Sequence, residues 1–225
     1  MLGPVIGDLL PSAVGVALSP VPIVAVVLIL ATPRARANGL AFALGWVAGL
    51  VVVCTLVMWL TGGAEDQNSD TNTLVAFLQL ALGVVLLGVA KKQWDKRPPE
   101  GERAELPAWM DAIADFTTGK SLLMGAALAA VNPKNLALTL AGAAAIAEGG
   151  LSGEGDAVAI AAFVLIGSAT TLLPVVGYLL LGDRIAAPLV RLRRWMAANN
   201  ATIMTVVCVI LAAKLIGTGI SGLTD

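Results

Sequence analysis

The sequence has no histidine and only two cysteines, Cys54 and Cys208, which lie in separate apolar runs. Zinc sites and thiol redox centres are usually built from histidine or from closely spaced cysteines, and the sequence offers neither. An isolated cysteine inside an apolar run is typical of a small buried side chain. The sequence therefore predicts no metal site, no disulfide framework and no cofactor.

Charged residues are also scarce. They make up 13% of the 225 residues, whereas hydrophobic residues make up 58%, and the mean hydropathy is +0.88. Soluble domains carry about 25% charged residues. Every Asp and Glu lies in a polar connection or near a terminus, so the apolar runs lack a carboxylate for general acid or base chemistry. The composition predicts an all-α membrane protein with a single membrane domain over residues 1–225, and not an enzyme.

Six apolar runs are long enough, or nearly so, to cross a bilayer, which requires about 20 helical residues. They cover approximately 13–31, 39–60, 74–90, 121–147, 157–181 and the chain from 201 onward. Two of the polar connections carry apolar residues at helical spacing. These segments, around 106–116 and within 183–200, are predicted to lie on the membrane surface.

The basic residues are distributed unevenly along the chain. Of the 14 Lys and Arg residues, all but Lys134 and Lys214 lie after the first span, between the third and fourth, or between the fifth and sixth. The positive-inside rule places these three connections in the cytoplasm and both termini outside. Because each half of the chain has three spans, the second half is expected to run opposite to the first.

Two spans contain a proline near their centre. In the fourth span, Asn132-Pro133-Lys134-Asn135 combines a helix breaker with a cation and two amides. Proline removes a backbone donor, and Asn before Pro is typical of a helix start, so we expect the helix to restart at Pro133. Ser19-Pro20-Val21-Pro22 repeats the pattern of a capping residue before proline 113 residues earlier. Interrupted backbone at this depth is tolerated where it is buried in protein or lines a polar cavity.

The paired breaks indicate an inverted repeat. Short apolar motifs also recur in the same order in both halves, at 41–44 and 162–165 and at 84–87 and 209–212. We expect repeats of approximately 9–91 and 120–222, joined by a cytoplasmic loop at 92–119. Paired breaks in inverted halves indicate the central site of a transporter. Two half-helix N-termini, each with about half a positive charge, would act with the Lys134 ammonium to select an anionic ligand. The alternative is a simple proline kink, with Lys134 extending along it to the surface.

Hydroxyl residues and a second lysine extend the candidate site. Thr170 and Thr171 follow Ser168 and precede Pro174 in the fifth span, where they either bind substrate or repair the backbone of a kink. Lys214 in the sixth span either belongs to the site or extends to the outer surface. The candidate substrate-binding residues are Ser19, Pro20, Pro22, Asn132, Pro133, Lys134, Asn135, Thr170, Thr171 and Lys214.

Together these motifs resemble a known family. A six-span chain with Ser-Pro-x-Pro in its first span, and with Leu106-Pro107-Ala108-Trp109 before Asn132-Pro133-Lys134-Asn135-Leu136, resembles the GAP (glycopeptidolipid- or sulfolipid-addressing protein) family of the LysE transporter superfamily. The resemblance covers essentially the whole chain. It implies a multi-pass protein of the bacterial inner (plasma) membrane, with six transmembrane helices in a 3+3 inverted repeat and with helices one and four broken at the two proline motifs.

The resemblance further implies outward movement of lipid-linked or acylated envelope material. We therefore expect a secondary transporter or flippase that exports an anionic, lipid-linked or acyl-bearing cell-envelope precursor. Its expected partners are this substrate and the membrane lipids, with no nucleic acid. One alternative is an exporter of small amino-acid-like solutes, which the superfamily also contains. The other is a non-catalytic subunit of an envelope-assembly complex, partnered by envelope-synthesis enzymes.

Overall fold

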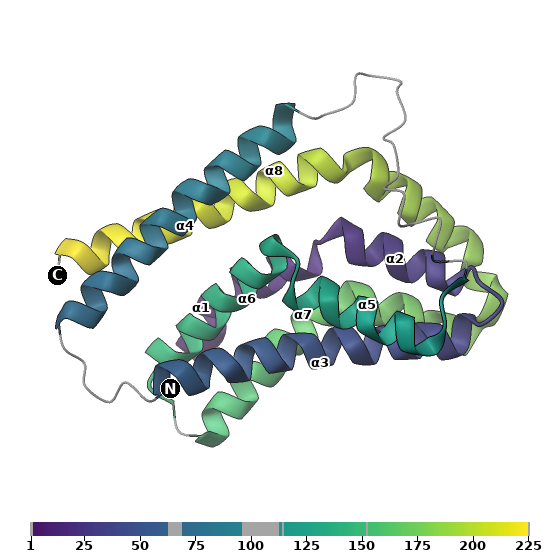
Figure 1. Ribbon diagram of the computed structural model, residues 1–225, viewed down its shortest axis with the longest axis horizontal. Coiled ribbons are helices and arrows are strands. Elements are labelled where there is room, and N and C mark those ends of the chain that lie inside the picture. Colours follow the sequence, from purple (N-terminus) through teal and green to yellow (C-terminus); the bar gives the residue numbers. More distant parts are fainter. Residues whose placement is uncertain (1, 63–68, 96–112, 114, 152, 225) are drawn as a thin grey trace. The chain divides into compact units, whose positions relative to one another are not determined.

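The computed structural model describes residues 2–62, 69–95, 113, 115–151 and 153–224. These residues are almost entirely helical, and no strand occurs among them, which confirms the predicted all-α class (Figure 1). In chain order the elements are α1 (Leu2–Ala17), α2 (Pro20–Leu30), α3 (Ala35–Gly62), α4 (Ser69–Asp95), α5 (Thr118–Ala130), α6 (Pro133–Glu148), α7 (Gly153–Leu181), the 3₁₀ helix η2 (Gly182–Ile185) and α8 (Ala186–Thr224).

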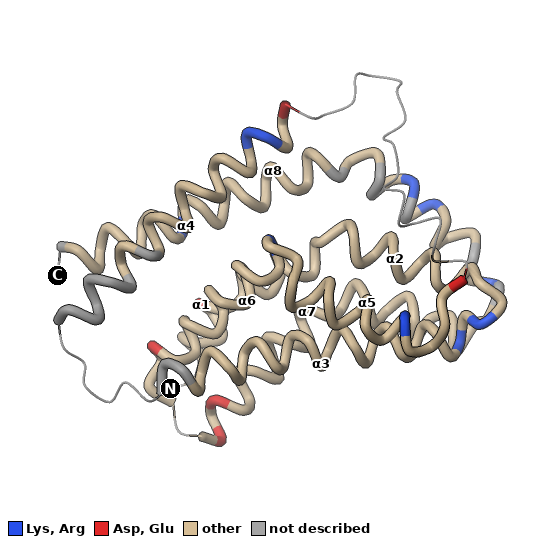
Figure 2. The backbone as a smooth tube through the Cα atoms, viewed as in Figure 1, with Lys and Arg blue, Asp and Glu red and all other residues tan. Residues whose placement is uncertain are grey.

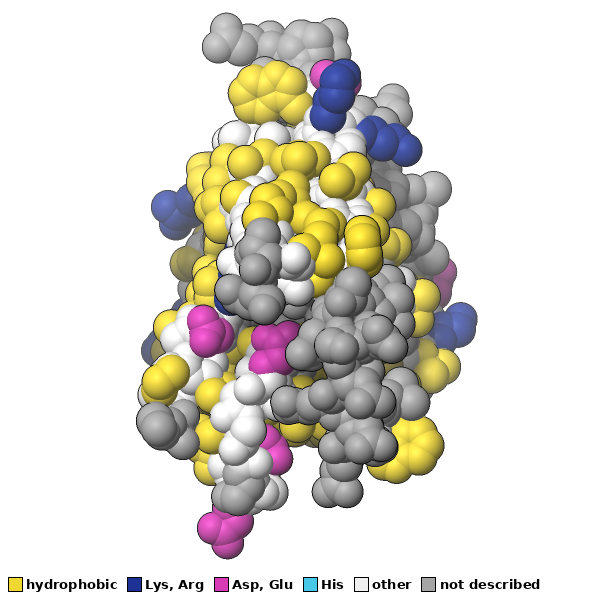
Figure 3. Space-filling view, turned by 90° about the vertical axis from the view of Figure 1, so that its left-hand side faces the viewer, with side chains coloured by type: hydrophobic (Ala, Val, Ile, Leu, Met, Phe, Trp, Pro, Cys, Tyr) yellow, Lys and Arg dark blue, Asp and Glu magenta, His cyan; other side chains and the backbone are white. Residues whose placement is uncertain are grey.

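Several of these helices are suited to a membrane. Within the described part of the chain, Ala35–Trp59, Gly153–Leu181 and Ala201–Leu223 are long and apolar enough to cross a bilayer. The pair α1 and α2 makes a fourth candidate, bent by 50° at its break. Large apolar side chains remain on the surface, Leu44 and Leu165 being 64% exposed, and Figure 3 shows hydrophobic side chains exposed over the upper part of the face that it presents. The chain is therefore a membrane protein, and its arrangement as six spans stays a prediction.

The chain divides into two compact units. The first contains residues 1–61 and 104–198, and the second contains 62–103 and 199–225. In the first unit α1 packs along α6 and α7, while α2 packs against α5 and α7. A buried apolar cluster that includes Ile29, Phe42 and Val175 forms a core around α2, α3 and α7. This core includes much of α2 and also packs against α5 through Met124 and Leu128.

Helices α3 and α5 of the first unit approach so closely that only glycine fits between them. A Cβ atom added at Gly45 would lie 2.0 Å from Leu122 O, and one added at Gly125 would lie 2.2 Å from Phe42 O. Small residues allow such backbone contact between helices in lipid. The position of α5, and with it the break that follows α5, is therefore fixed against α3.

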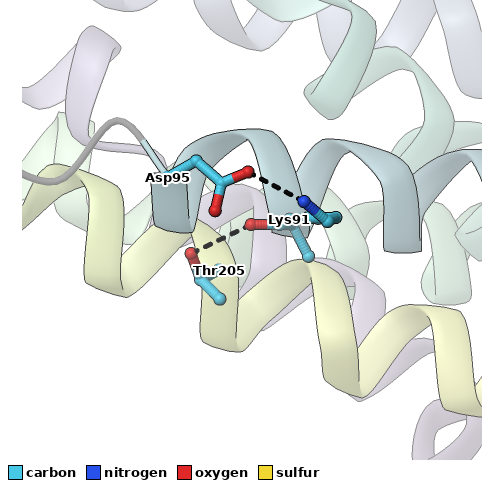
Figure 4. A network of polar contacts seen from close by, with 4 residues as sticks. Lys91, Asp95 and Thr205 are labelled. Atoms are coloured by element: carbon cyan, nitrogen blue, oxygen red, sulfur yellow. Dashed lines mark hydrogen bonds and ion pairs between the residues drawn. The ribbon is translucent and has the colours of Figure 1, made fainter.

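The second unit is an antiparallel pair made of α4 and the C-terminal part of α8. Gly83 faces Ala212 and Ile216, whereas Ala76, earlier in α4, lies beside Gly219 and Gly222, later in α8. The pair is also joined by a hydrogen bond from Thr205 Oγ1 to Ala90 O at 3.3 Å, near the exposed ion pair of Lys91 and Asp95 at 3.1 Å (Figure 4). Exposed pairs at this spacing contribute about 0.3–0.5 kcal/mol, so the glycine contacts matter more for this unit.

Two expected boundaries differ from the structure. The first helical run begins at Leu2 rather than near residue 13, because Pro4 lies in its first turn, where proline is tolerated, and Asp8 lies on an exposed side. The arginine-rich segment 183–200 is not separate from the last span, since α8 continues through it as one helix. The expected surface helix around 106–116 lies mostly outside the described residues, but Ile113 is only 1% exposed and belongs to the core of the first unit.

Candidate functional site

The first break separates α1 from α2. α1 ends at Ala17, and α2 begins at Pro20, with Pro22 also in its first turn. Ser19 occupies the N-cap position with extended backbone (φ −81°, ψ 109°), but its side chain makes no capping hydrogen bond. The sequence thus located the break and its N-cap residue correctly, but the Ser19 side chain does not make the hydrogen bond typical of that position. Ser19, Pro20 and Pro22 are all buried, so this break lies inside the first unit.

The second break separates α5 from α6. α5 ends at Ala130 and α6 begins at Pro133, as predicted. Asn132 has extended backbone (φ −61°, ψ 117°), and its Oδ1 accepts a hydrogen bond from Lys134 N at 3.2 Å. The first backbone bond of α6, from Leu136 N to Asn132 O, measures 2.8 Å. Asn132 is therefore the N-cap of a half-helix, which confirms the interpretation of the Asn-Pro pair.

Lys134 connects the two breaks. Its side chain is buried, with 6% exposure, and Nζ donates a hydrogen bond of 2.9 Å to Gly15 O, 119 residues away. Gly15 lies in the last turn of α1, where carbonyl groups lack a partner within the helix, and the Ser19 amide donates to Val16 O instead. The carbonyl end of a helix carries a partial negative charge that favours a cation. The alternative in which Lys134 extends to the surface does not fit this burial.

Thr170 makes the corresponding contact from α7. Its Oγ1 donates to Ala17 O, the last residue of α1. Pro20 has no N–H group, so it offers no donor to the carbonyls that the break leaves open. Two carbonyls of the last turn of α1 are thus bonded by side chains of other helices, Gly15 O by α6 and Ala17 O by α7. Thr170 bonds a neighbouring helix here rather than a carbonyl of its own helix.

Asn135 makes a similar hydrogen bond to a carbonyl near the end of α5. It is fully buried, and its Nδ2 donates to Leu128 O at 2.9 Å, while Thr139 Oγ1 donates to Asn135 O at 2.8 Å. Leu128 precedes Pro133 by five residues, the same separation as between Gly15 and Pro20. In both halves, therefore, the carbonyl at this position accepts a hydrogen bond from a side chain in the first turn of α6.

Two buried polar atoms near the breaks lack a hydrogen-bond partner within the described residues. They are Asn135 Oδ1 and Ser168 Oγ, and both residues are 0% exposed. A buried polar group left unpaired costs about 1–3 kcal/mol, so such groups usually serve a bound water or ligand. The first unit can therefore offer a cation at Lys134, an acceptor at Asn135 and hydroxyl groups on α7.

The structure brings most of the predicted residues together around the end of α1. Lys134 and Thr170 contact α1 directly, and Ser19, Pro20 and Pro22 continue the chain from it. Thr171 is 1% exposed in the same helix as Thr170. Lys214 belongs to the second unit, so its membership of the site stays a prediction.

Sequence reasoning missed the acceptors of these bonds. The acceptors are the backbone carbonyls of Gly15, Ala17 and Leu128. Every residue has such a carbonyl, so only the distance to a proline could have indicated these positions. No group of three or more His, Cys, Asp or Glu residues that could hold a metal ion occurs in the described ranges.

Interrupted apolar helices with a buried cation and a buried amide, Lys134 and Asn135, at the second break define a multi-pass membrane protein with polar groups in its interior. The chain belongs to the SfLAP family, described as Sap, sulfolipid-1-addressing protein, whose model matches residues 9–221. This match confirms the resemblance to the sulfolipid-addressing family that the two proline motifs indicated. No curated protein and no solved structure matched the chain.

Proposed function

We propose that this protein is a secondary transporter or flippase, and not an enzyme, that exports an anionic, lipid-linked or acyl-bearing precursor of the cell envelope. The family description, which names a sulfolipid, supports a lipid-related role in the envelope. A sulfolipid combines acyl chains with an anionic head, which is the chemistry expected for the ligand. The observation that carries the proposal is Lys134, a buried cation at the meeting point of two helix breaks.

Lys134 is placed where an anion would be stabilised. It lies in the first turn of α6, whose N-terminal amides carry about half a positive charge. A cation at the membrane centre costs on the order of 3 kcal/mol by insertion scales, so intramembrane lysines usually serve a function. An anionic head group would add charge-assisted hydrogen bonds to the ammonium, which are about twice as strong as neutral ones.

The contact with Gly15 suggests how binding could drive movement. The Lys134 ammonium joins α6 to the end of α1 through one carbonyl. An anion that took over this donor would leave Gly15 O without its bond and weaken the connection between α1 and α6. Movement of one repeat against the other around a fixed site is the general route to alternating access in transporters with inverted repeats.

We further propose that the fold is the 3+3 inverted repeat of the LysE superfamily. Exchanging the halves would convert α1 into α5, α2 into α6 and α3 into α7. The packing of α1 against α6 would then correspond to that of α5 against α2, and both contacts occur. The close pairing of α3 with α5 would likewise correspond to that of α7 with α1, where Gly167 lies against Val16. These paired contacts support the repeat.

The proposed orientation places both termini outside the bacterial inner membrane. In the first unit, basic residues gather at the end formed by the α2–α3 turn, the start of α5 and η2, whereas the acidic residues of α1 and of the start of α7 lie at the other end (Figure 2). The positive-inside rule supports a cytoplasmic location for the basic end.

Reconstitution tests the proposal directly. Purified protein in liposomes should move a fluorescent sulfated or phosphorylated lipid between leaflets, measured by quenching with an impermeant reagent. The Lys134→Ala variant should lose this activity, while Lys120→Ala, which removes an exposed lysine at the start of α5, should retain it. Activity in cells without activity in liposomes would instead favour the non-catalytic subunit. Movement of amino acids but not of lipids would favour the exporter of small solutes.

A further inference from the structure

A polar cavity lies at the basic end of the first unit, away from the helix breaks. Its volume is about 270 Å³, and it is lined by Thr32, Pro33, Arg34, Asn38, Asp115 and Phe116. One wall is the turn between α2 and α3 with the first turn of α3, and the other is the segment just before α5. The space corresponds to about nine water molecules at 30 Å³ each, enough for a small polar group but not for a whole lipid.

Hydrogen bonds hold the two walls of this cavity together. Asn38 is 1% exposed, its Nδ2 donates to Phe116 O at 2.8 Å, and its Oδ1 accepts from Thr118 Oγ1 at 3.2 Å. These bonds join positions that are 78 and 80 residues apart. Thr32 Oγ1 donates to Ile29 O at 2.7 Å, which fixes the turn. The cavity is therefore formed before any ligand arrives.

Two opposite charges line the cavity without pairing with each other. Arg34 and Asp115 are both exposed, and no ion pair joins the two among the described residues. An anion alone would be attracted by Arg34 and repelled by Asp115. A simple cation would be attracted by Asp115 and repelled by Arg34. A ligand that carries both an anionic group and an ammonium group satisfies both side chains.

The cavity lies at the depth of lipid head groups. Arg34 immediately precedes Ala35, the first residue of a candidate membrane span. The neighbouring basic residues Arg36 and Lys120 are exposed, and Figure 2 shows this end of the unit carrying both charge signs. Charged side chains at the end of an apolar span lie where the hydrocarbon gives way to the head groups.

From these observations we infer that the cavity binds the zwitterionic head group of a membrane phospholipid of the ethanolamine type. The phosphate contacts Arg34, which can donate two parallel hydrogen bonds to it. The primary ammonium donates to Asp115, a bond that a quaternary choline ammonium cannot make. The inference requires only that α3 spans the membrane, and it is independent of what the protein transports.

Lipid binding to the purified protein tests this inference. Binding of short-chain phosphatidylethanolamine, phosphatidylglycerol and phosphatidylcholine would be measured for the wild type, Arg34→Gln, Asp115→Asn and the control Arg36→Gln. Arg34→Gln should weaken binding of the ethanolamine and glycerol lipids about tenfold, because it removes the phosphate donor. Asp115→Asn should have opposite effects on the two lipids. It should weaken binding of the ethanolamine lipid and strengthen binding of the anionic glycerol lipid. Arg36→Gln should change neither by more than about twofold.

Opposite responses to Asp115→Asn cannot arise from general damage to the fold. Equal changes for both lipids in that variant, or unchanged binding of the ethanolamine lipid in both cavity variants, would overturn the inference. Competition by soluble phosphoethanolamine provides a further test. If it competes as well as the short-chain lipid at equal concentration, the ligand is a free phosphate ester and the assignment to a lipid is wrong.

Discussion

Lys134 shows which part of a residue's role can be predicted from sequence. Its neighbours Asn132 and Pro133 predict a helix start, and a lysine in an apolar span predicts a functional position. Its partner could not be predicted, because Gly15 O is a backbone atom 119 residues away that becomes available only when α1 ends. The sequence around Lys134 thus predicts the helix start and the functional position, but it does not predict the hydrogen-bond partner.

The Lys134 series is the first prediction. Lys134→Ala leaves Gly15 O unpaired, at a cost of about 1–3 kcal/mol, but removes a buried charge that costs on the order of 3 kcal/mol. Thermal stability in detergent should therefore change little, while export is lost. Lys134→Arg should retain partial export because the charge survives on a bulkier planar head, and Lys134→Glu should be the least active. Export of the envelope precursor is measured at matched protein levels, and wild-type export by Lys134→Ala would contradict the prediction.

At the scale of the element, the two breaks look alike in sequence but are stabilised differently. Both have a capping residue before proline, yet only Asn132 makes the capping bond, since the Ser19 side chain forms none. The position of a break follows from the missing N–H of proline. Whether the preceding side chain caps the new helix depends on its rotamer, which packing around it decides.

This difference gives a paired prediction. Asn132→Ala should lower the free energy of unfolding by about 1 kcal/mol, since it removes a side-chain acceptor from the first turn of α6. Ser19→Ala should lower it much less, because no capping bond is lost. Thermal unfolding of the two variants in the same detergent provides the comparison. A larger loss for Ser19→Ala would show that its hydroxyl has a role that the observed contacts do not explain.

A third prediction concerns the contact between α3 and α5. Gly125→Ala places a Cβ 2.2 Å from Phe42 O, so the two helix backbones must separate. Overpacking of this kind costs about 1–3 kcal/mol or more. Gly88→Ala in α4 is the control, because nothing lies within 4 Å of its added Cβ and alanine favours a helix by about 1 kcal/mol. After heating, size-exclusion chromatography should show aggregation of Gly125→Ala at a lower temperature, and equal behaviour of the two variants would contradict the close approach.

At the scale of the whole molecule, composition predicted the class and the prolines predicted both breaks. The extent of the first helical run was missed, since Pro4, Asp8 and Pro11 suggest a non-helical start although α1 contains all three. The unbroken course of α8 was also missed, because its polar first part and its apolar last part read as separate segments. Helix continuity depends on backbone hydrogen bonds, which a change from polar to apolar side chains does not interrupt.

The proposed orientation gives the fourth prediction. In a background with Cys54 and Cys208 replaced by alanine, a cysteine at Glu154 should react with an impermeant thiol reagent added to intact cells. A cysteine at Arg36 should react only after the cells are opened, since the basic end is proposed to lie in the cytoplasm. Both positions are exposed, so burial does not account for a difference. Labelling of Arg36→Cys from outside would reverse the orientation.

The bonds at the end of α1 also bear on how the chain is made. Gly15 O is bonded by Lys134, which leaves the ribosome 119 residues later, about 6–24 s at 5–20 residues per second. Neither α5 nor α6, with 13 and 16 residues, is long enough by itself to cross a hydrocarbon layer of about 30 Å. The first broken helix must therefore wait in the membrane, with Gly15 O and Ala17 O unpaired, until the later helices are inserted. Insertion factors that shelter incomplete helices would act during that interval.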